Sequence, residues 1–407
     1  MKTTSHRIEH QTSLLSALLA TGLFTAGVSS ALADSLEEAL RGGEASLDIR
    51  LRYEWVRQDG AADNARASTV RTRIGYRTGT YRGLQAFVEM ENTSAVGSEG
   101  YRVPGASPYG PRTPGRPIVA DPLFTELNQA WLELTGPYTT RIRYGRQRVT
   151  LDNHRFIGNV GWRQNEQTYD ALTLRNTAVD GLSILYGYFT NANTVIGTDR
   201  RMGSHVLNVS YGKLPLGRLT AYAYLLDFEA GAGTDSRTVG ARLAGELPAG
   251  DLRLGYLIEY AQQDSYADSS GLDHAYHRLE LGLGLRGLTF RIGEERLGGD
   301  GGTAFQTPLA TLHAMNGWAD RFLTTPADGL VDRFLSVGGK VAGIALRAVY
   351  HDFSADRGDR SYGDEIDLLA LYRFGRHITL GVKYAGYDAD SFSVDTDKAW
   401  VWIQARR

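Results

Sequence analysis

Arginine recurs at every second position in two short stretches near the start of the chain. Arg50 and Arg52 lie in SLDIRLRYEW, and Arg71 and Arg73 lie in TVRTRIGYRT. A guanidinium group stays charged at any relevant pH and offers five N–H donors in a planar fork that suits carboxylates. The chemistry that these residues predict is reversible contact with anions, without a covalent step.

The spacing of these arginines is that of a β-strand, in which successive side chains point to opposite faces. In the first stretch one face carries Leu47, Ile49, Leu51, Tyr53 and Trp55, and the other carries Asp48, Arg50, Arg52 and Glu54. An apolar face against lipid and a charged face towards a water-filled interior explain this pattern.

The same alternation continues along the chain and predicts an all-β protein. We expect eighteen strands near 45–57, 66–79, 82–93, 124–135, 139–147, 166–176, 179–192, 201–212, 216–229, 235–247, 250–263, 273–286, 287–297, 331–340, 342–354, 362–374, 376–388 and 395–406. Short turns alternate with long polar loops, which is typical of an 18-stranded antiparallel transmembrane β-barrel with short periplasmic turns and long extracellular loops. A soluble sandwich is the alternative, but it seldom needs so many strands.

The chain ends and composition agree with an exported protein. Residues 1–33 resemble a signal peptide, with Ala31 and Ala33 as a small-x-small cleavage pattern. Residues 34–407 then form one barrel domain, with long loops at 94–123 and 298–330. Cysteine is absent, which excludes disulfides and thiolate metal sites. We expect the outer membrane of a Gram-negative bacterium.

The predicted interior is rich in arginine, while the formal net charge is only −2. Arg141, Arg143 and Arg347 also fall on inward faces, and a row of fixed cations in a narrow low-dielectric tube favours anions. The alternative is that these arginines pair with luminal carboxylates such as Glu89 and Glu133 and only keep the interior polar.

Other chemistry has weak support in the sequence. Ser204 and His205 could be combined with an acidic residue on paper, but residue types alone carry no geometry, so we expect no catalytic residue. His274 lacks further ligating neighbours, so we expect no metal site and no cofactor. The acidic run 388–397 could hold Ca²⁺, although such runs are more often a solvated rim. We expect no nucleic acid partner.

Two segments resemble the alginate export family: YGRQRVTLDNHRFIGNVGWRQNEQTYDAL (144–172) and FQTPLATLHAMNGWADRFLTTPADGLVD (305–332). The resemblance implies an eighteen-stranded outer-membrane barrel that exports the polyuronate alginate through an arginine-lined constriction. It also implies roles for Arg146, Gln147, Asp152, Arg155, Trp162, Arg163, Trp318 and Asp320. Packing or turn capping is the alternative for the two tryptophans and for Asp152.

The chain departs from the family pattern at its late periplasmic turn, FGRH (374–377), which is short, and it ends in WIQARR without a terminal aromatic residue. A periplasmic plug is therefore not expected, and uptake of small anionic or sugar-like solutes stays open beside polymer export. Expected partners are the anionic polysaccharide or small anion, outer-membrane lipid and lipopolysaccharide, and periplasmic export components. The residues expected to line the pore and guide the substrate are Arg50, Arg52, Arg71, Arg73, Glu89, Arg141, Arg143, Arg146, Asp152, Arg155, Arg163 and Arg347.

Overall fold

The structure, a computed structural model, describes residues 35–231 and 233–407, so the predicted signal peptide lies outside the described residues. A short helix, α1 (Leu36–Arg41), precedes the strands, and a 3₁₀ turn, η1 (Leu312–Ala314), lies between two of them. The strands are β1 (Glu44–Gln58), β2 (Ala65–Arg77), β3 (Leu84–Gly100), β4 (Thr125–Thr135), β5 (Thr140–Gln147), β6 (Thr168–Asn176), β7 (Leu182–Asn193), β8 (Asp199–Leu214), β9 (Gly217–Leu226), β10 (Ser236–Ala249), β11 (Leu252–Asp264), β12 (Asp273–Leu285), β13 (Leu288–Leu297), β14 (Leu330–Val341), β15 (Ile344–Ser354), β16 (Ser361–Phe374), β17 (Ile378–Ala389) and β18 (Thr396–Arg406).

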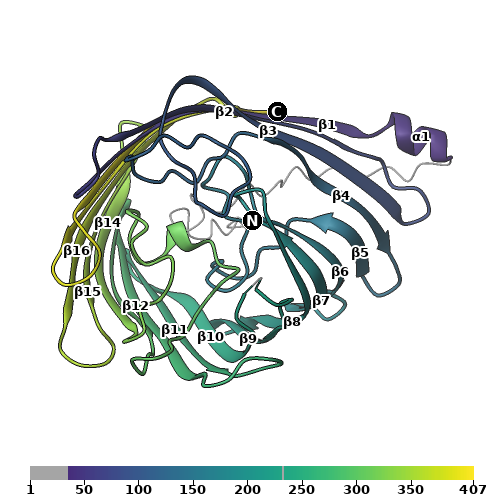
Figure 1. Ribbon diagram of the computed structural model, residues 1–407. Helices are drawn as coiled ribbons and strands as arrows, with labels where there is room; N and C mark the ends of the chain where they lie inside the picture. The colour runs from purple at the N-terminus through teal and green to yellow at the C-terminus, as the bar shows by residue number, and fades with distance from the viewer. Residues whose placement is uncertain (1–34, 232) are drawn as a thin grey trace, which may run out of the picture.

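The eighteen strands form one closed sheet, as predicted. Each strand pairs antiparallel with the next along the chain, and β1 pairs with β18 to complete the ring (Figure 1). In a bilayer no water is available to satisfy backbone N–H and C=O groups, so only a sheet without edges can pair all of them. Among the described residues, no helix is long and apolar enough to cross a membrane.

The inside–outside alternation that the sequence predicts for β1 is confirmed. Leu51 on the outer face is 44% exposed, whereas Arg52 beside it is 1% exposed. Leu279, Leu281 and Ile292 repeat the outward apolar pattern on the other side of the ring. The outer surface is therefore an apolar band of the kind that faces lipid.

The two ends of the barrel differ in the length of their connections. One end, called here the short-turn end, carries the connections 78–83, 136–139, 177–181, 215–216, 250–251, 286–287, 342–343 and 375–377. Arg286 and Gly287 form a two-residue turn with φ of 50° and 83°, the geometry that matches the twist of a hairpin. The opposite, long-loop end carries 101–124, 148–167 and 298–329.

One predicted boundary is wrong: β3 continues to Gly100, whereas the predicted strand ends at 93. The extension pairs with β2, where Thr69 lies opposite Ala95 and Arg66 opposite Gly100 after a bulge. The segment from Ser94 onward is polar and lacks the membrane alternation, but an antiparallel ladder can continue beyond the bilayer without an apolar face. The long loop is therefore 101–124.

The interior of the barrel is largely occupied by coil segments from the long-loop end. Figure 1 shows coil, including η1, crossing the space inside the ring of strands. An aromatic cluster joins these coil segments to the barrel wall. The centre of the Phe156 ring lies 5.1 Å from that of Tyr222 on β9 and 6.1 Å from that of Phe305 in the segment 298–329. The hydrophobic core thus lies inside the barrel, between loops and wall.

Candidate functional site

Two loops that are far apart in sequence are bonded to each other inside the barrel. The early interior loop is residues 148–167, and the late interior loop is residues 298–329. Gly158 N donates to Leu309 O at 2.9 Å, and Thr311 N donates to His154 O at 3.0 Å. Because these are backbone bonds, they fix the two loops to each other whatever their side chains do.

The arginines of β1 hold the early interior loop against the wall. Arg50 donates to Gln164 Oε1 at 2.9 Å and to Gly161 O at 3.3 Å. Arg52 donates to Trp162 O at 2.5 Å and forms an ion pair with Asp121 of loop 101–124. These two arginines face the interior, as predicted, but the loops cover them, so they are not open to the predicted water-filled lumen.

The arginines of β2 are covered in the same way. Arg71, which is 0% exposed, pairs with Asp48 at 2.6 Å. Arg73 pairs with Glu91 and lies 3.2 Å from Glu166 of the early interior loop. The predicted alternative, pairing between luminal arginines and carboxylates, therefore describes this side of the interior.

Glu166 is the main anionic contact of the early interior loop. Its carboxylate accepts hydrogen bonds from Arg148 Nε at 2.9 Å, Asn128 Nδ2 at 2.9 Å and Asn159 Nδ2 at 3.1 Å. Burial disfavours the charged carboxylate, but Arg148 and Arg73 outweigh burial and lower the pKa of Glu166 to about 2. Glu89 accepts from the same Asn128 at 2.7 Å, so this predicted residue belongs to the same network.

Asp320 links both interior loops to the wall. Its carboxylate lies 2.7 Å from Arg163 Nη2, 2.7 Å from His313 Nδ1 and 2.6 Å from Lys398 Nζ on β18. Burial works against its charge, but His313, Lys398 and Arg163 hold the pKa of Asp320 well below its usual range. Three charged or titratable groups from two loops and one strand thus meet at one carboxylate.

His313 is enclosed by aromatic rings and by a lysine. Its ring stacks on Trp162 at 4.9 Å with an angle of 2° between the planes. Its Nε2 lies 2.7 Å from Lys383 Nζ, which is also 3.7 Å from the centre of the Trp318 ring. Burial and the nearby Lys383 hold the pKa of His313 well below its usual range despite Asp320. The two tryptophans of the family resemblance therefore both contact this cluster.

A different group of arginines lies at the short-turn end, where the loops do not cover the wall. Arg141 on β5 and Arg175 on β6 are cross-strand neighbours on the inward face, and both are exposed. Within the described chain, neither has a carboxylate within 4.0 Å. Arg143 beside them pairs with Glu133 at 2.6 Å and lies 3.9 Å above the Trp131 ring. Surplus positive charge is therefore concentrated at this end.

The remaining predicted residues are spread over the interior. Arg146 pairs with Asp170 at 2.8 Å, and Asp152 accepts from Asn208 at 2.8 Å. Arg155 lies 3.1 Å from Glu295 on β13. Gln147 accepts a hydrogen bond from Thr173, and Arg347 lies on β15 with its guanidinium 6.0 Å from the Trp318 ring. The structure does not bring the predicted set together as one constriction ring.

Several residues of the interior network were not selected from the sequence: Gln164, Glu166, His313, Lys383 and Lys398. Gln164 and Glu166 lie within the motif GWRQNEQ, so their neighbours carried a signal. Lys383 and Lys398 fall on inward positions of alternating strands, which the period-2 pattern could have revealed. His313 lies in coil, and nothing in its local sequence indicates that it stacks on a residue of another loop.

Comparison with known proteins identifies the type of barrel. The sequence profile of the alginate export family matches residues 45–184, which include the first of the two resembling segments. A search of curated proteins gives no match.

Solved structures share the fold. They include Pseudomonas aeruginosa OccK9 (OpdG), with 16% identity, a TM-score of 0.71 and coverage of 91% of this chain and 100% of that one. P. aeruginosa OpdK, solved with vanillate, has 15% identity, a TM-score of 0.70 and coverage of 90% and 99%. Acinetobacter baumannii OccAB4 has 13% identity, a TM-score of 0.70 and coverage of 90% and 98%.

Likeness at these identities shows the fold alone, and the closed ring, the apolar outer band and the polar interior agree with it. The chain is therefore a closed 18-stranded β-barrel of the outer-membrane type, and its residues 45–184 match the alginate export family.

Proposed function

We propose that the protein passes anionic solutes across the outer membrane, and that its leading cargo is an anionic polysaccharide of the alginate type, exported by passive guidance. One observation carries the proposal: inward arginines that have no carboxylate partner among the described residues, Arg141 and Arg175 among them, lie at the short-turn end. Fixed cations on a low-dielectric wall raise the local concentration of anions. The match of residues 45–184 to a family described as alginate export supports the polysaccharide.

Transport also requires that bound cargo leaves. A carboxylated sugar held by several free guanidiniums would dissociate slowly, because charge-assisted hydrogen bonds are about twice as strong as neutral ones. Glu133 accepts two hydrogen bonds from the Arg143 guanidinium and would compete with the cargo for these donors. Alternation of free and paired arginines gives contacts that are weak enough for release.

Ten of the twelve predicted guiding residues then divide into two roles. Arg141, Arg143 and Arg347 would contact the cargo. Arg50, Arg52 and the other buried members would act indirectly, because they hold the interior loops that shape the passage. Lipid and lipopolysaccharide surround the barrel, and periplasmic export components would deliver the polymer to the short-turn end.

A second candidate is uptake of small carboxylates. The observation that favours it is the filling of the interior by loops that are bonded to each other and to the wall. The structure of P. aeruginosa OpdK contains vanillate, a small carboxylate, and that barrel has a similar fold. Under this alternative the same arginines would guide a monomer through a narrow gap beside fixed loops.

Planar-bilayer recording tests both candidates. A KCl gradient should give an anion-selective reversal potential, and the double variant Arg141→Gln, Arg175→Gln should move this potential towards zero. Arg376→Gln, in an exposed short turn outside the inward wall, is the matched control and should leave it unchanged. Current block by a polyuronate oligomer supports the polymer, and permeation of glucuronate without block by the oligomer supports small-solute uptake. Absence of anion selectivity would contradict the proposal as a whole.

A further inference from the structure

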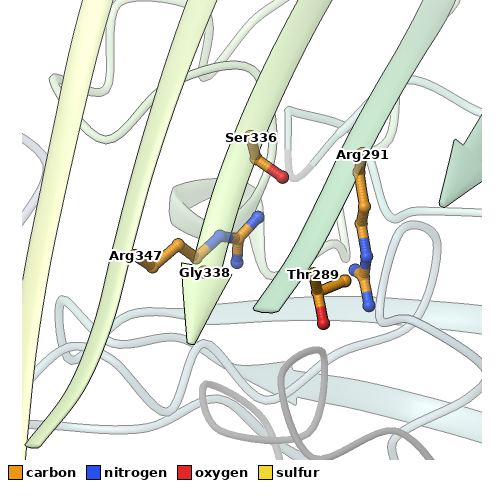
Figure 2. A pocket seen from close by; sticks show the side chains of 5 residues that line it. All are labelled: Thr289, Arg291, Ser336, Gly338 and Arg347. Atoms are coloured by element: carbon orange, nitrogen blue, oxygen red, sulfur yellow. The ribbon is translucent and has the colours of Figure 1, made fainter. Parts of the chain in front are cut away.

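A small pocket in the barrel wall is lined by two arginines, two hydroxyl side chains and a glycine. It lies between β13, β14 and β15 on the inward face, and its lining residues are Thr289, Arg291, Ser336, Gly338 and Arg347. Figure 2 shows the guanidinium groups of Arg291 and Arg347 on two sides of this space, with the hydroxyl groups of Ser336 and Thr289 beside them. None of the five side chains carries negative charge.

The register of the strands explains how two arginines come to share this space. Gly338 on the middle strand lies opposite Thr289 on one side and opposite Arg347 on the other. Ser336 lies opposite Arg291. Because Gly338 has no side chain and Ser336 has a short one, the long side chains of the two outer strands can extend over the middle strand.

The local charges do not balance. Arg291 pairs with Glu280 at 3.4 Å, but Glu280 is shared with Arg278 at 3.3 Å. Arg347 has no carboxylate within 4.0 Å among residues 35–231 and 233–407. Arg347 therefore brings to the pocket a positive charge that no carboxylate of the described residues neutralises within 4.0 Å.

The pocket is also partly shielded from water. Both arginines are half-buried, and Ser336 is 5% exposed. The Arg347 guanidinium also lies over the Trp318 ring of the late interior loop, 6.0 Å from its centre, so one side of this arginine faces an aromatic ring. Electrostatic attraction for an anion is stronger in such a place than at an open surface, since the effective dielectric constant is lower.

We propose that this pocket is a binding subsite for a single carboxylate group, held between Arg291 and Arg347 with the hydroxyl groups of Ser336 and Thr289 as further donors. A carboxylate has the one negative charge that the surplus requires and the planar oxygens that a guanidinium fork fits. The subsite rests on the proposed function, because it gives the anionic cargo a defined stopping point. The carboxylate comes either from a free monomer or from one uronate unit of a polymer.

Saturation of single-channel current measures occupancy of the subsite. Purified full-length protein is reconstituted in a planar bilayer, and D-glucuronate is titrated as the only permeant anion. The current should saturate with an apparent dissociation constant that rises about tenfold in Arg347→Gln and in Arg291→Gln, since each change removes a charge-assisted contact. Arg347→Lys should give an intermediate value, because it keeps the charge and loses the fork. Heat-modifiable mobility in a gel confirms that each variant has folded.

Arg253→Gln is the matched control, because Arg253 is inward at the short-turn end of β11 and lies outside the pocket. It should leave the dissociation constant within about twofold. A polyuronate oligomer in place of glucuronate separates the two sources: block by the oligomer that weakens in Arg347→Gln places a polymer unit in the subsite, whereas binding of glucuronate alone assigns it to a monomer.

The outcomes separate the subsite from the proposed function. Wild-type current that does not saturate, or saturation that is unchanged in both pocket variants, overturns the subsite even if the channel is anion-selective. Saturation that weakens in the pocket variants of a channel without overall anion selectivity retains the subsite and rejects the proposed function.

Discussion

Replacement of Asp320 by asparagine tests whether the ion cluster holds the interior loops. Asp320 accepts from Arg163 and His313 of the two loops and from Lys398 of the wall at 2.6–2.7 Å, and it is 7% exposed. Asparagine has nearly the same shape but lacks the charge, and its amide presents N–H groups to donors. Removal of one partner from a buried ion pair costs about 3–5 kcal/mol, because the other charge stays buried without compensation.

The lost free energy should destabilise the packing of the interior loops rather than the folded barrel. The backbone ladder of the eighteen strands does not include Asp320, so the wall can remain intact while the late interior loop detaches. A loss of 3 kcal/mol raises the ratio of open to packed loop by roughly a hundredfold, since about 1.4 kcal/mol is a factor of ten.

Two measurements detect detachment of the late interior loop. Single-channel recording of Asp320→Asn should show larger or more frequent openings than wild type. Limited trypsin digestion should cut faster at Arg321, which is half-buried in the packed loop. Asp359→Asn is the matched control, because Asp359 is an exposed carboxylate at the long-loop rim. Wild-type conductance together with wild-type trypsin resistance in Asp320→Asn would refute the role of the cluster.

Three further predictions concern pH, a glycine and the outer face. Burial lowers the pKa of His313, so the loop packing that it supports should be complete above about pH 6.5 and weaken as pH falls below that value, which a conductance series from pH 8 to 5 measures; a flat series would contradict this. Gly317→Ala should loosen the late loop by about 1–3 kcal/mol, because φ is 82° and a Cβ would lie 2.4 Å from the Glu365 carboxylate. Gly358→Ala, with φ of 81° and open space, is its control, and equal trypsin sensitivity of the two variants would disprove the steric argument. Leu279→Arg at the centre of β12 should destabilise the folded barrel by about 2–4 kcal/mol in a urea titration in lipid vesicles, and an unchanged midpoint would mean that this face does not meet lipid.

The fold could be predicted from the sequence because two solvents impose one pattern on every strand. A residue such as Leu51 must face lipid and its neighbour Arg52 must then face inward, so side-chain direction follows from sequence position alone. The continuation of β3 to Gly100 was missed because this constraint ends where the bilayer ends. Outside the bilayer, a strand can continue its backbone pairing without an apolar face.

The site was predictable only in part, because alternation gives the direction of a side chain and not what covers it. Arg52 and Arg141 have the same local pattern, yet Arg52 is 1% exposed beneath a loop whereas Arg141 is open. The difference depends on where loop 148–167 packs. Contacts such as the stacking of Trp162 on His313 join residues that are far apart in the chain, and no local period encodes them.

The division of the interior arginines into covered and open groups has a consequence for how such barrels diverge. Under the proposed function, substitutions among open residues such as Arg141 and Arg175 would alter what the channel attracts without disturbing any ion pair with the rest of the described chain. Substitutions at Arg50 or Arg52 dislodge a loop. Cargo preference can thus drift from species to species on an unchanged scaffold, and two homologues with the same buried arginines need not carry the same solute.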